Sequence, residues 1–292
     1  MKYIAVTCEN RNHLREFHAR KADEVIFPLE NHSFFAGREY SVSEITEMIT
    51  EAHQTGMKAT VLMNRLFHED EVQDACRNML EVIEKGADHI EFADPALFYF
   101  ARSNGFADRM IYESSTLMTN AYDGSFWLEQ EANNVIISSL LTKEEIVEIA
   151  KKMKNSGVVI HGHLLMSVSK RKLLSAFSEE YGLASLKDRT TVTLQELQRQ
   201  EHMPAFENSQ AMMIYSDYVQ ESFAEMPLFM EAGIERYEIH SPFLAEEALL
   251  DAVDVYRKIL DGQDAENEIG EYRMKYSHLS LSDGYYGKKT VK

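Results

Sequence analysis

Short apolar segments alternate with amphipathic helical segments along most of this chain, and no other feature constrains its fold as strongly. The apolar segments are short and continuous, which is typical of strands in a parallel sheet that is buried on both faces. There are eight of them, at residues 2–8, 24–29, 59–64, 89–93, 110–114, 134–138, 158–163 and 236–241. Eight strand–helix repeats with short connections predict an α/β fold, a (β/α)8 TIM-type barrel, whether perfectly closed or not.

Helix start signals support this interpretation of the segments between the strands. Ser41 and Glu44 have the spacing of a capping box, in which each side chain bonds to the backbone of the other residue. Thr142 and Glu145 repeat the pattern before a segment with one apolar face. These signals place helices after the predicted second and sixth strands.

One long span interrupts the alternation, between the seventh and eighth predicted strands. Residues 175–230 are polar and contain no clear strand, so we expect a helical insertion at the end of the barrel where active sites lie. Residues 1–262, including this insertion, then form the barrel domain. Residues 263–292 form a C-terminal extension with little order visible in the sequence.

Composition argues against several classes of protein. The formal net charge of −18 opposes non-specific binding to nucleic acid, which needs Lys and Arg to neutralise phosphates. Two cysteines, Cys8 and Cys76, cannot supply the four thiolates of an iron–sulfur cluster, so no such cluster is expected. No apolar run approaches the roughly 18 residues of a transmembrane helix, and no signal peptide precedes the first strand. We therefore expect a cytoplasmic protein without a membrane partner.

Histidines at the ends of the last two predicted strands are the first candidates for chemistry. His161 and His163 share one face of their strand by alternation, and His240 ends the neighbouring strand. Three imidazoles at a barrel mouth predict a site for a divalent metal such as zinc, iron or manganese. In the alternative interpretation, His161 makes hydrogen bonds within the mouth and His163 caps a loop. Glu238 shares a face with His240 and predicts an acid–base pair, unless the two are polar without chemistry.

Other polar residues of the same region are candidates for binding substrate. Asn64, Asp94 and Ser115 follow predicted strands, at the end of the barrel that carries function. Lys170 and Arg171 lie in a basic turn that could hold a phosphate or an acidic partner. A solvated basic turn is the alternative for these last two.

Several motifs resemble those of the peptidase U32 (collagenase-like) family. His161-Gly162 matches the start of its H-G-x-x-C signature, Asp94-Pro95 resembles its D-P turn, and Ala232-Gly233-Ile234 resembles the segment before its last strand. Leu165 and Lys172 occupy the positions of two cysteines of the signature. The resemblance implies a barrel. Some members are peptidases; others support hydroxylation of tRNA, ribosomal RNA or quinone precursors, often with a four-cysteine iron–sulfur cluster and sometimes as pairs of U32 subunits.

Three hypotheses about function follow. The run 66–72 is most similar to the short subunit of a tRNA uridine-hydroxylation pair, which implies a cluster-free subunit acting on wobble uridine with a second U32 protein. Such a subunit would contact tRNA indirectly or through its partner. The second hypothesis is a peptidase-like or metal-dependent hydrolase that uses the three histidines. The third is a non-catalytic paralogue that serves as a scaffold. A homo-oligomer is compatible with all three.

Overall fold

Eight parallel strands close into a barrel in the computed structural model, which describes residues 2–186, 189–195, 197–198 and 200–288. The eight strands of the barrel are β1 (Tyr3–Thr7), β2 (Glu24–Pro28), β3 (Lys58–Met63), β4 (His89–Phe92), β5 (Met110–Tyr112), β6 (Asn134–Ile137), β7 (Ser156–Ser169) and β11 (Arg236–Ile239). Each strand pairs with the next, and β11 pairs with both β7 and β1, which completes the ring. The predicted TIM-type barrel is confirmed.

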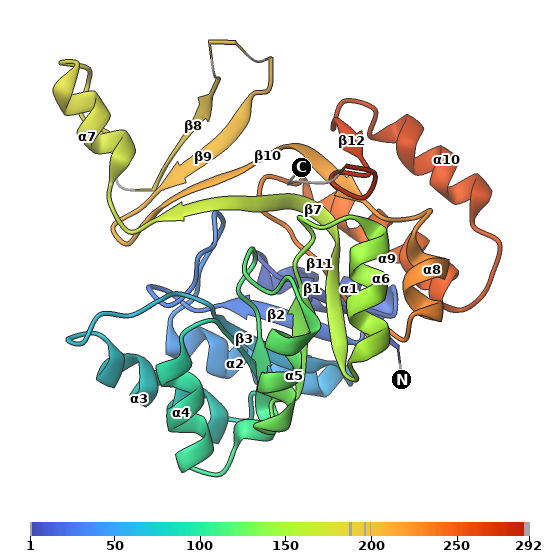
Figure 1. Cartoon of the computed structure of the whole chain (residues 1–292), viewed down its shortest axis with the longest axis horizontal. Helices are drawn as coiled ribbons and strands as arrows, with labels where there is room; N and C mark the ends of the chain where they lie inside the picture. Colours follow the sequence, from blue (N-terminus) through green and yellow to red (C-terminus); the bar gives the residue numbers. More distant parts are fainter. Residues whose placement is uncertain (1, 187–188, 196, 199, 289–292) are drawn as a thin grey trace.

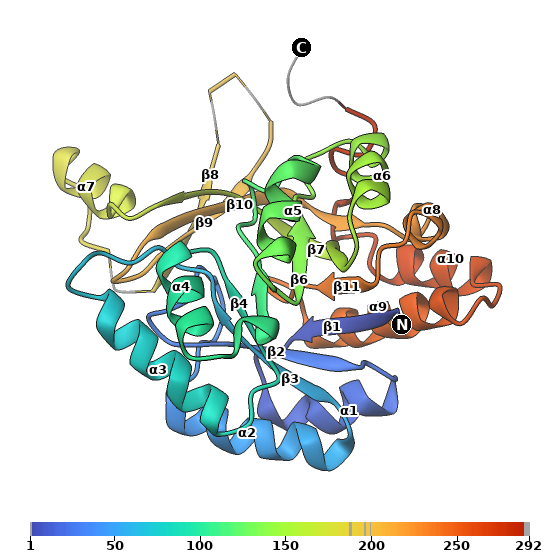
Figure 2. The same ribbon diagram turned by 60° about the horizontal axis from the view of Figure 1, so that its bottom comes forward.

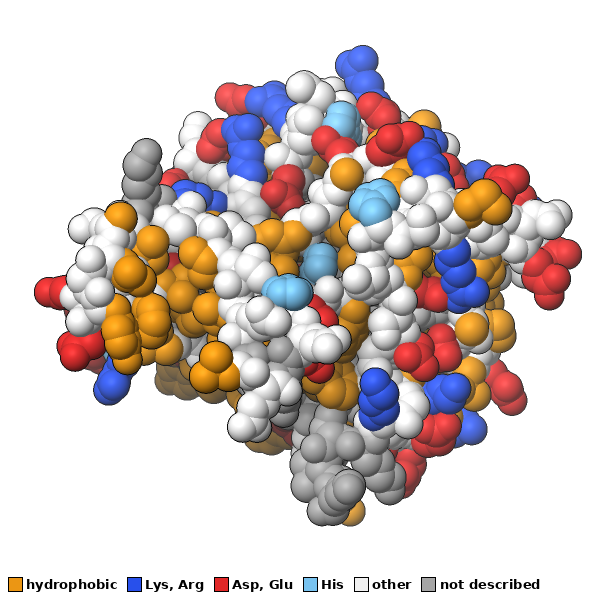
Figure 3. Space-filling model, turned by 90° about the horizontal axis from the view of Figure 1, so that it is seen from above, with side chains coloured by type: hydrophobic (Ala, Val, Ile, Leu, Met, Phe, Trp, Pro, Cys, Tyr) orange, Lys and Arg blue, Asp and Glu red, His pale blue; other side chains and the backbone are white. Residues whose placement is uncertain are grey.

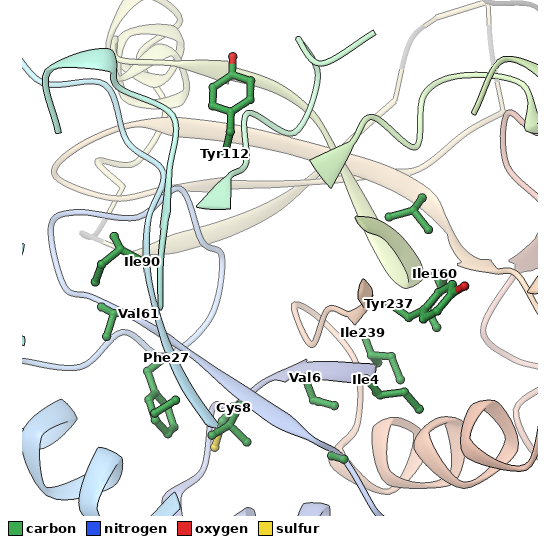
Figure 4. Close-up of a cluster of buried hydrophobic side chains, with 14 of the residues drawn as sticks. Ile4, Val6, Cys8, Phe27, Val61, Ile90, Tyr112, Ile160, Tyr237 and Ile239 are labelled. Carbon is green, nitrogen blue, oxygen red and sulfur yellow. The ribbon is translucent and has the colours of Figure 1, made fainter. Parts of the chain in front are cut away.

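Helices surround the barrel on the outside (Figures 1 and 2). They are α1 (Leu14–Ala19), α2 (Val42–Thr55), α3 (Val72–Glu84), α4 (Pro95–Ser103), α5 (Ala121–Glu129), α6 (Lys143–Lys152), α8 (Met226–Glu231) and α9 (Glu246–Leu260), with short 3-10 helices at Arg11–His13 and Ala107–Arg109. Both predicted capping boxes form, at the starts of α2 and α6. The main core lies between strands and helices, where every second strand residue contributes an apolar side chain, such as Val6, Phe27 and Ile239 (Figure 4). No helix in the described residues is long and apolar enough to cross a membrane.

The insertion between the last two barrel strands is mainly a β-structure, so the predicted helical insertion is wrong in its secondary structure. Strand β7 continues well beyond the barrel, where it pairs with β10 (Met212–Glu221). Strand β10 pairs in turn with β9 (Met203–Glu207), and β9 pairs with β8 (Thr190–Leu194). All three pairings are antiparallel. Among the described residues of the predicted span, only α7 (Leu173–Glu180) and α8 are helical. The β-branched Thr and Val residues of β8 favour a strand, but the run is polar and therefore lacks the apolar pattern by which the other strands are predicted. We call residues 164–219 the arm; residues 187, 188, 196 and 199 lie outside the described residues.

The C-terminal extension is more ordered than the sequence suggests. It contains α10 (Glu266–Lys275) and β12 (Leu281–Ser282), which pairs with β10. Tyr286 is completely buried, and its hydroxyl bonds to Gln220 Nε2 at 2.9 Å and to Ser222 Oγ at 2.7 Å. The order comes from these tertiary contacts, which no local sequence pattern reports. Residues 289–292 lie outside the described part of the chain.

A loop after β2 closes the barrel mouth together with the arm. Phe35 is buried against Ala5, Ile26 and Leu62, residues of three neighbouring barrel strands. The backbone N–H of the next residue, Ala36, donates to the hydroxyl of Tyr215 on the arm at 3.1 Å. The residues at the mouth are therefore covered and largely shielded from solvent.

Candidate active site at the barrel mouth

Charged side chains form one layer of the barrel interior. Arg236, at the start of β11, is completely buried. Its Nε donates to Glu238 Oε1 at 2.6 Å and its Nη1 to Glu24 Oε1 at 2.7 Å, while its Nη2 donates to Glu91. We call these four residues the interior charge cluster. Three carboxylates around one guanidinium leave an excess of negative charge that water does not screen, so one carboxyl is expected to hold a proton.

The environments of the three carboxyl groups identify the protonated one. Burial is the largest single influence and would raise the pKa of Glu24 and of Glu238, but the Arg236 guanidinium together with His89 beside Glu24 and His240 beside Glu238 outweighs it and holds both pKa values below their ordinary range. Burial, and then the charge of Glu238, raise the pKa of Glu91 well above its ordinary value. We therefore expect Glu91 to be the neutral carboxylic acid of the cluster.

Glu238 connects this cluster to the mouth. Its second oxygen, Oε2, lies 3.0 Å from Nε2 of His240, and the His240 side chain is 25% exposed. The structure thus brings together the two residues that alternation predicted to share a face. Because Arg236 holds the other oxygen of Glu238, the carboxylate is fixed and orients the imidazole ring.

A second carboxyl group, Glu113, lies just after β5 and was not anticipated from the sequence. Its Oε1 accepts hydrogen bonds from the backbone N–H of Ser115 at 2.6 Å and from its hydroxyl at 3.0 Å, and its Oε2 accepts from Asn64 Nδ2 at 2.5 Å. Burial, and then the charge of Glu238, raise the pKa of Glu113. Ser115 has φ +58°, a left-handed conformation that is strained for a residue with a side chain. Such strain is concentrated at functional sites.

Glu113 and His240 face one small cavity of about 30 Å³. The other residues that line it are Ser115, Ile136, Ile137, Ser139, Leu140, Val159, Leu164 and Leu165. A cavity of this size has room for a water molecule. The carboxyl group of Glu113, with its raised pKa, lies across this cavity from the Glu238–His240 pair. In such an arrangement the carboxyl group can donate a proton and the imidazole can accept one. The mouth is therefore equipped for acid–base chemistry.

The predicted three-histidine metal site does not form. Val159 pairs with Glu238, whereas His161 pairs with the next residue, Ile239, so β7 carries one extra residue at this point. This bulge reverses the alternation, and His161 consequently points outward to the helices instead of into the barrel. No group of three His, Cys, Asp or Glu residues that could hold a metal occurs among the described residues.

His161 instead joins the barrel wall to two helices. Its Nε2 lies 2.9 Å from the hydroxyl of Tyr272 on α10, and its Nδ1 lies 3.3 Å from that of Tyr256 on α9. Burial, and then His163, lower the pKa of His161 to about 3, so it is neutral at physiological pH. His163 bonds through Nδ1 to the carbonyl of Ser216 at 2.8 Å. Neither ring lines the cavity, so the predicted catalytic role of both histidines finds no geometric support.

Replacement of His161 with glutamine is expected to change the pH dependence of stability. The unfolded chain takes up a proton on His161 below its ordinary pKa of 6.5, whereas the folded protein does so only near pH 3. Acid therefore favours the unfolded state, and wild type loses about 2 kcal/mol between about pH 6.5 and 5 that the variant keeps. Urea denaturation of both proteins across this range checks the difference. Parallel stability curves would show that His161 is protonated in the fold.

The remaining predicted binding residues divide into two groups. Asn64 and Ser115 belong to the mouth, as described. Asp94 caps α4 through the N–H of Ala96 and also accepts from the N–H of Phe67, both at 2.8 Å, so its carboxylate is occupied by backbone. The other two predicted residues lie away from the cavity. Lys170 donates to Glu71 and to the carbonyl of Leu66, and Arg171 is exposed on the arm.

The residues do not fit a four-cysteine cluster. Cys8 and Cys76 are both buried free thiols on the outer side of the barrel wall, in its core with the helices. Leu165 lines the cavity, and Lys172 is exposed at the start of α7. No step of chemistry is therefore assigned to an iron–sulfur centre in this chain.

Fold and mouth together define a TIM-type barrel protein with carboxyl and imidazole side chains, Glu113, Glu238 and His240, gathered at the carboxyl ends of its strands. The chain belongs to peptidase family U32, whose family model matches residues 9–292. It is 26% identical over 228 residues to tRNA hydroxylation protein P2 of Bacillus subtilis (strain 168), covering 76% of this chain and 74% of that protein. It is 33% identical over 134 residues to tRNA hydroxylation protein P of Escherichia coli (strain K12), covering 44% of this chain and 29% of that one.

A solved structure agrees with the fold. The U32 peptidase Mk0906 superposes with a TM-score of 0.52 at 12% sequence identity, over 82% of this chain and 93% of that one. At this level of identity the likeness concerns the architecture, and it supports the TIM-type barrel.

Proposed function

We propose that this protein is a subunit in the hydroxylation of tRNA at wobble uridine and that it acts with a second U32 protein. The observation that carries the proposal is the match to tRNA hydroxylation protein P2, which extends over about three quarters of both chains. Two further relatives are named tRNA hydroxylation protein P. Names that distinguish P from P2 favour two U32 chains in this process.

The composition of the chain supports a function that requires a partner protein. Its two cysteines cannot hold the cluster that the family often uses, so any redox step belongs to the partner. Its net charge of −18 repels phosphates, so the partner also supplies the main contacts to tRNA.

The barrel mouth is the contribution that we assign to this chain. Glu113 supplies a proton and His240, oriented by Glu238, accepts one, both at the same cavity. Access requires the loop that carries Phe35 to move away, because this loop covers the mouth. Partner binding is the event that we expect to open it.

Deletion of the gene tests the proposal. Total tRNA from the deletion strain is digested to nucleosides, and hydroxylated wobble uridine is quantified by mass spectrometry. We expect the modified nucleoside to fall sharply and to return when the gene is restored on a plasmid. An unchanged amount in the deletion strain, with no second gene of the same type present, would refute the proposed function.

A further inference from the structure

Helix α7, at the tip of the arm, exposes an apolar stripe. Leu173, Phe177 and Tyr181 are spaced four residues apart and are 46%, 55% and 67% exposed. The rings of Phe177 and Tyr181 lie 4.5 Å apart. The helix stands away from the barrel (Figure 1), and hydrophobic side chains gather on this end of the molecular surface (Figure 3, left). Contiguous apolar surface of this kind on a soluble protein marks an interaction site.

The charges that flank the stripe are arranged against the stability of the helix itself. Arg171 and Lys172 precede α7, and Glu179 and Glu180 end it, all four exposed. Positive charge at the N-terminus and negative charge at the C-terminus oppose the helix dipole. The helix has eight residues, and the Glu207 carboxylate of β9 stabilises its start by accepting from the N–H groups of Leu174 at 2.8 Å and Ser175 at 3.1 Å. Within the part of the chain that is described, these four side chains form no ion pair, so their charges remain available to a partner.

We propose that α7 packs antiparallel against α7 of a second copy of this chain, across a two-fold axis near Ala176. In an isologous contact each residue meets the counterpart of another, so the two apolar stripes face each other. The two-fold axis also places Lys172 beside Glu180 of the second copy, twice. Each basic start then lies next to an acidic end, which reverses the unfavourable charge order of the single helix. The exposed methyl of Ala176 permits a close approach at the crossing point.

The size of the contact sets its strength. Eight residues of helix span about 12 Å, and the stripe falls well short of the roughly 800 Å² per partner of a standard stable interface. The dimer is therefore weak, with a dissociation constant on the order of tens of micromolar. The contact is at the tip of the arm and does not involve the barrel mouth, and the proposal does not depend on the proposed role in tRNA hydroxylation.

Sedimentation velocity of the full chain from about 1 to 300 µM tests self-association. Wild type is expected to shift from monomer to dimer across this range. Phe177→Glu is expected to remain monomeric throughout, because it places a charge in the stripe. Phe126→Glu on α5 is the matched control, since Phe126 is also 55% exposed, and it is expected to dimerise like wild type. Circular dichroism checks that each variant is folded. If Phe177→Glu is not folded, Phe177→Ser is used in its place.

Charge reversal tests the antiparallel geometry. Lys172→Glu and Glu180→Lys are each expected to weaken the dimer about tenfold, and the double variant is expected to restore it, because each pair is then reversed but complete. A wild type that stays monomeric at every concentration overturns the proposal. So does dimerisation that is insensitive to Phe177→Glu, or a double variant no better than the single ones. The proposal is also overturned if this protein does not self-associate but binds a second U32 chain through Phe177, because the stripe would then belong to that partner.

Discussion

Replacement of Arg236 with methionine is expected to lower the free energy of unfolding by about 3–5 kcal/mol. Arg236 is completely buried and is the guanidinium that compensates Glu24 and Glu238. Methionine fills similar space but leaves the Glu24 and Glu238 carboxylates without the guanidinium, with the rings of His89 and His240 as their remaining neighbours. The loss is a large part of the roughly 5–15 kcal/mol that stabilise a typical domain. Urea denaturation at pH 7, followed by circular dichroism, measures it.

Two controls separate the buried charge from the loss of an arginine. Arg11→Met removes an exposed arginine that pairs with Glu47 and Glu51 on the surface, where such pairs contribute about 1 kcal/mol or less. The Arg236→Met loss is also expected to shrink as the pH falls toward 5, because protonation removes the uncompensated charge. A loss no larger than that of Arg11→Met would contradict the interior charge cluster as described.

Glu113→Gln and His240→Gln are each expected to lower the rate of tRNA hydroxylation by about 10²–10⁴-fold. Glutamine keeps the size of Glu113 and, through its one carbonyl oxygen, the hydrogen bonds from Ser115, but it loses the bond from Asn64 and has no acidic proton to give. Glutamine at position 240 similarly removes the imidazole that Glu238 orients. The rate is measured by mass spectrometry in an extract of the deletion strain to which purified variant protein is added.

Matched variants away from the mouth guard against indirect effects. Glu148→Gln on α6 and His53→Gln on α2 change exposed groups of the same chemical types, each in a surface ion pair. Both are expected to hydroxylate tRNA at close to the wild-type rate. Wild-type rates for Glu113→Gln and His240→Gln, at normal stability, would remove the mouth from the reaction.

The barrel could be predicted from sequence because its signals are local. Each strand is a short apolar run, and each capping box lies within four residues, so the eight repeats and the starts of α2 and α6 follow from neighbouring residues. The arm could not be predicted in the same way. Strand β10 pairs with β7 between residues far apart in the chain, such as Glu221 with His161, and the Thr-rich, polar sequence of β8 does not show the apolar pattern of a buried strand.

The candidate site was only half predictable for a related reason. Simple alternation places Glu238 and His240 on one face, and the structure agrees. The same rule fails for His161, because a one-residue bulge in β7 turns its side chain to the helices. That bulge depends on Gly162, which has φ +121° and whose added Cβ would lie 2.4 Å from the carbonyl oxygen of His240. The spacing of the histidine pair in the sequence does not indicate such a bulge.

The interior charge cluster does have a signal in the sequence. Glu24, Glu91 and Arg236 stand within or at the start of otherwise apolar strand segments, on the faces that turn into the barrel. A charge that is buried on a strand needs an opposite charge or a proton, so three such residues on different strands predict that they meet. Glu113 follows from the same argument at the end of β5.

The most direct test of the central claim is the addition of purified protein to an extract of the deletion strain that contains its own undermodified tRNA. We expect hydroxylated wobble uridine to appear in proportion to the protein added, and the Glu113→Gln, His240→Gln double variant to restore none of it. An extract of the unmodified parent strain, prepared in the same way, is the positive control. If that extract hydroxylates the tRNA but wild-type protein restores nothing in the deletion extract, a role for this chain in tRNA hydroxylation is contradicted.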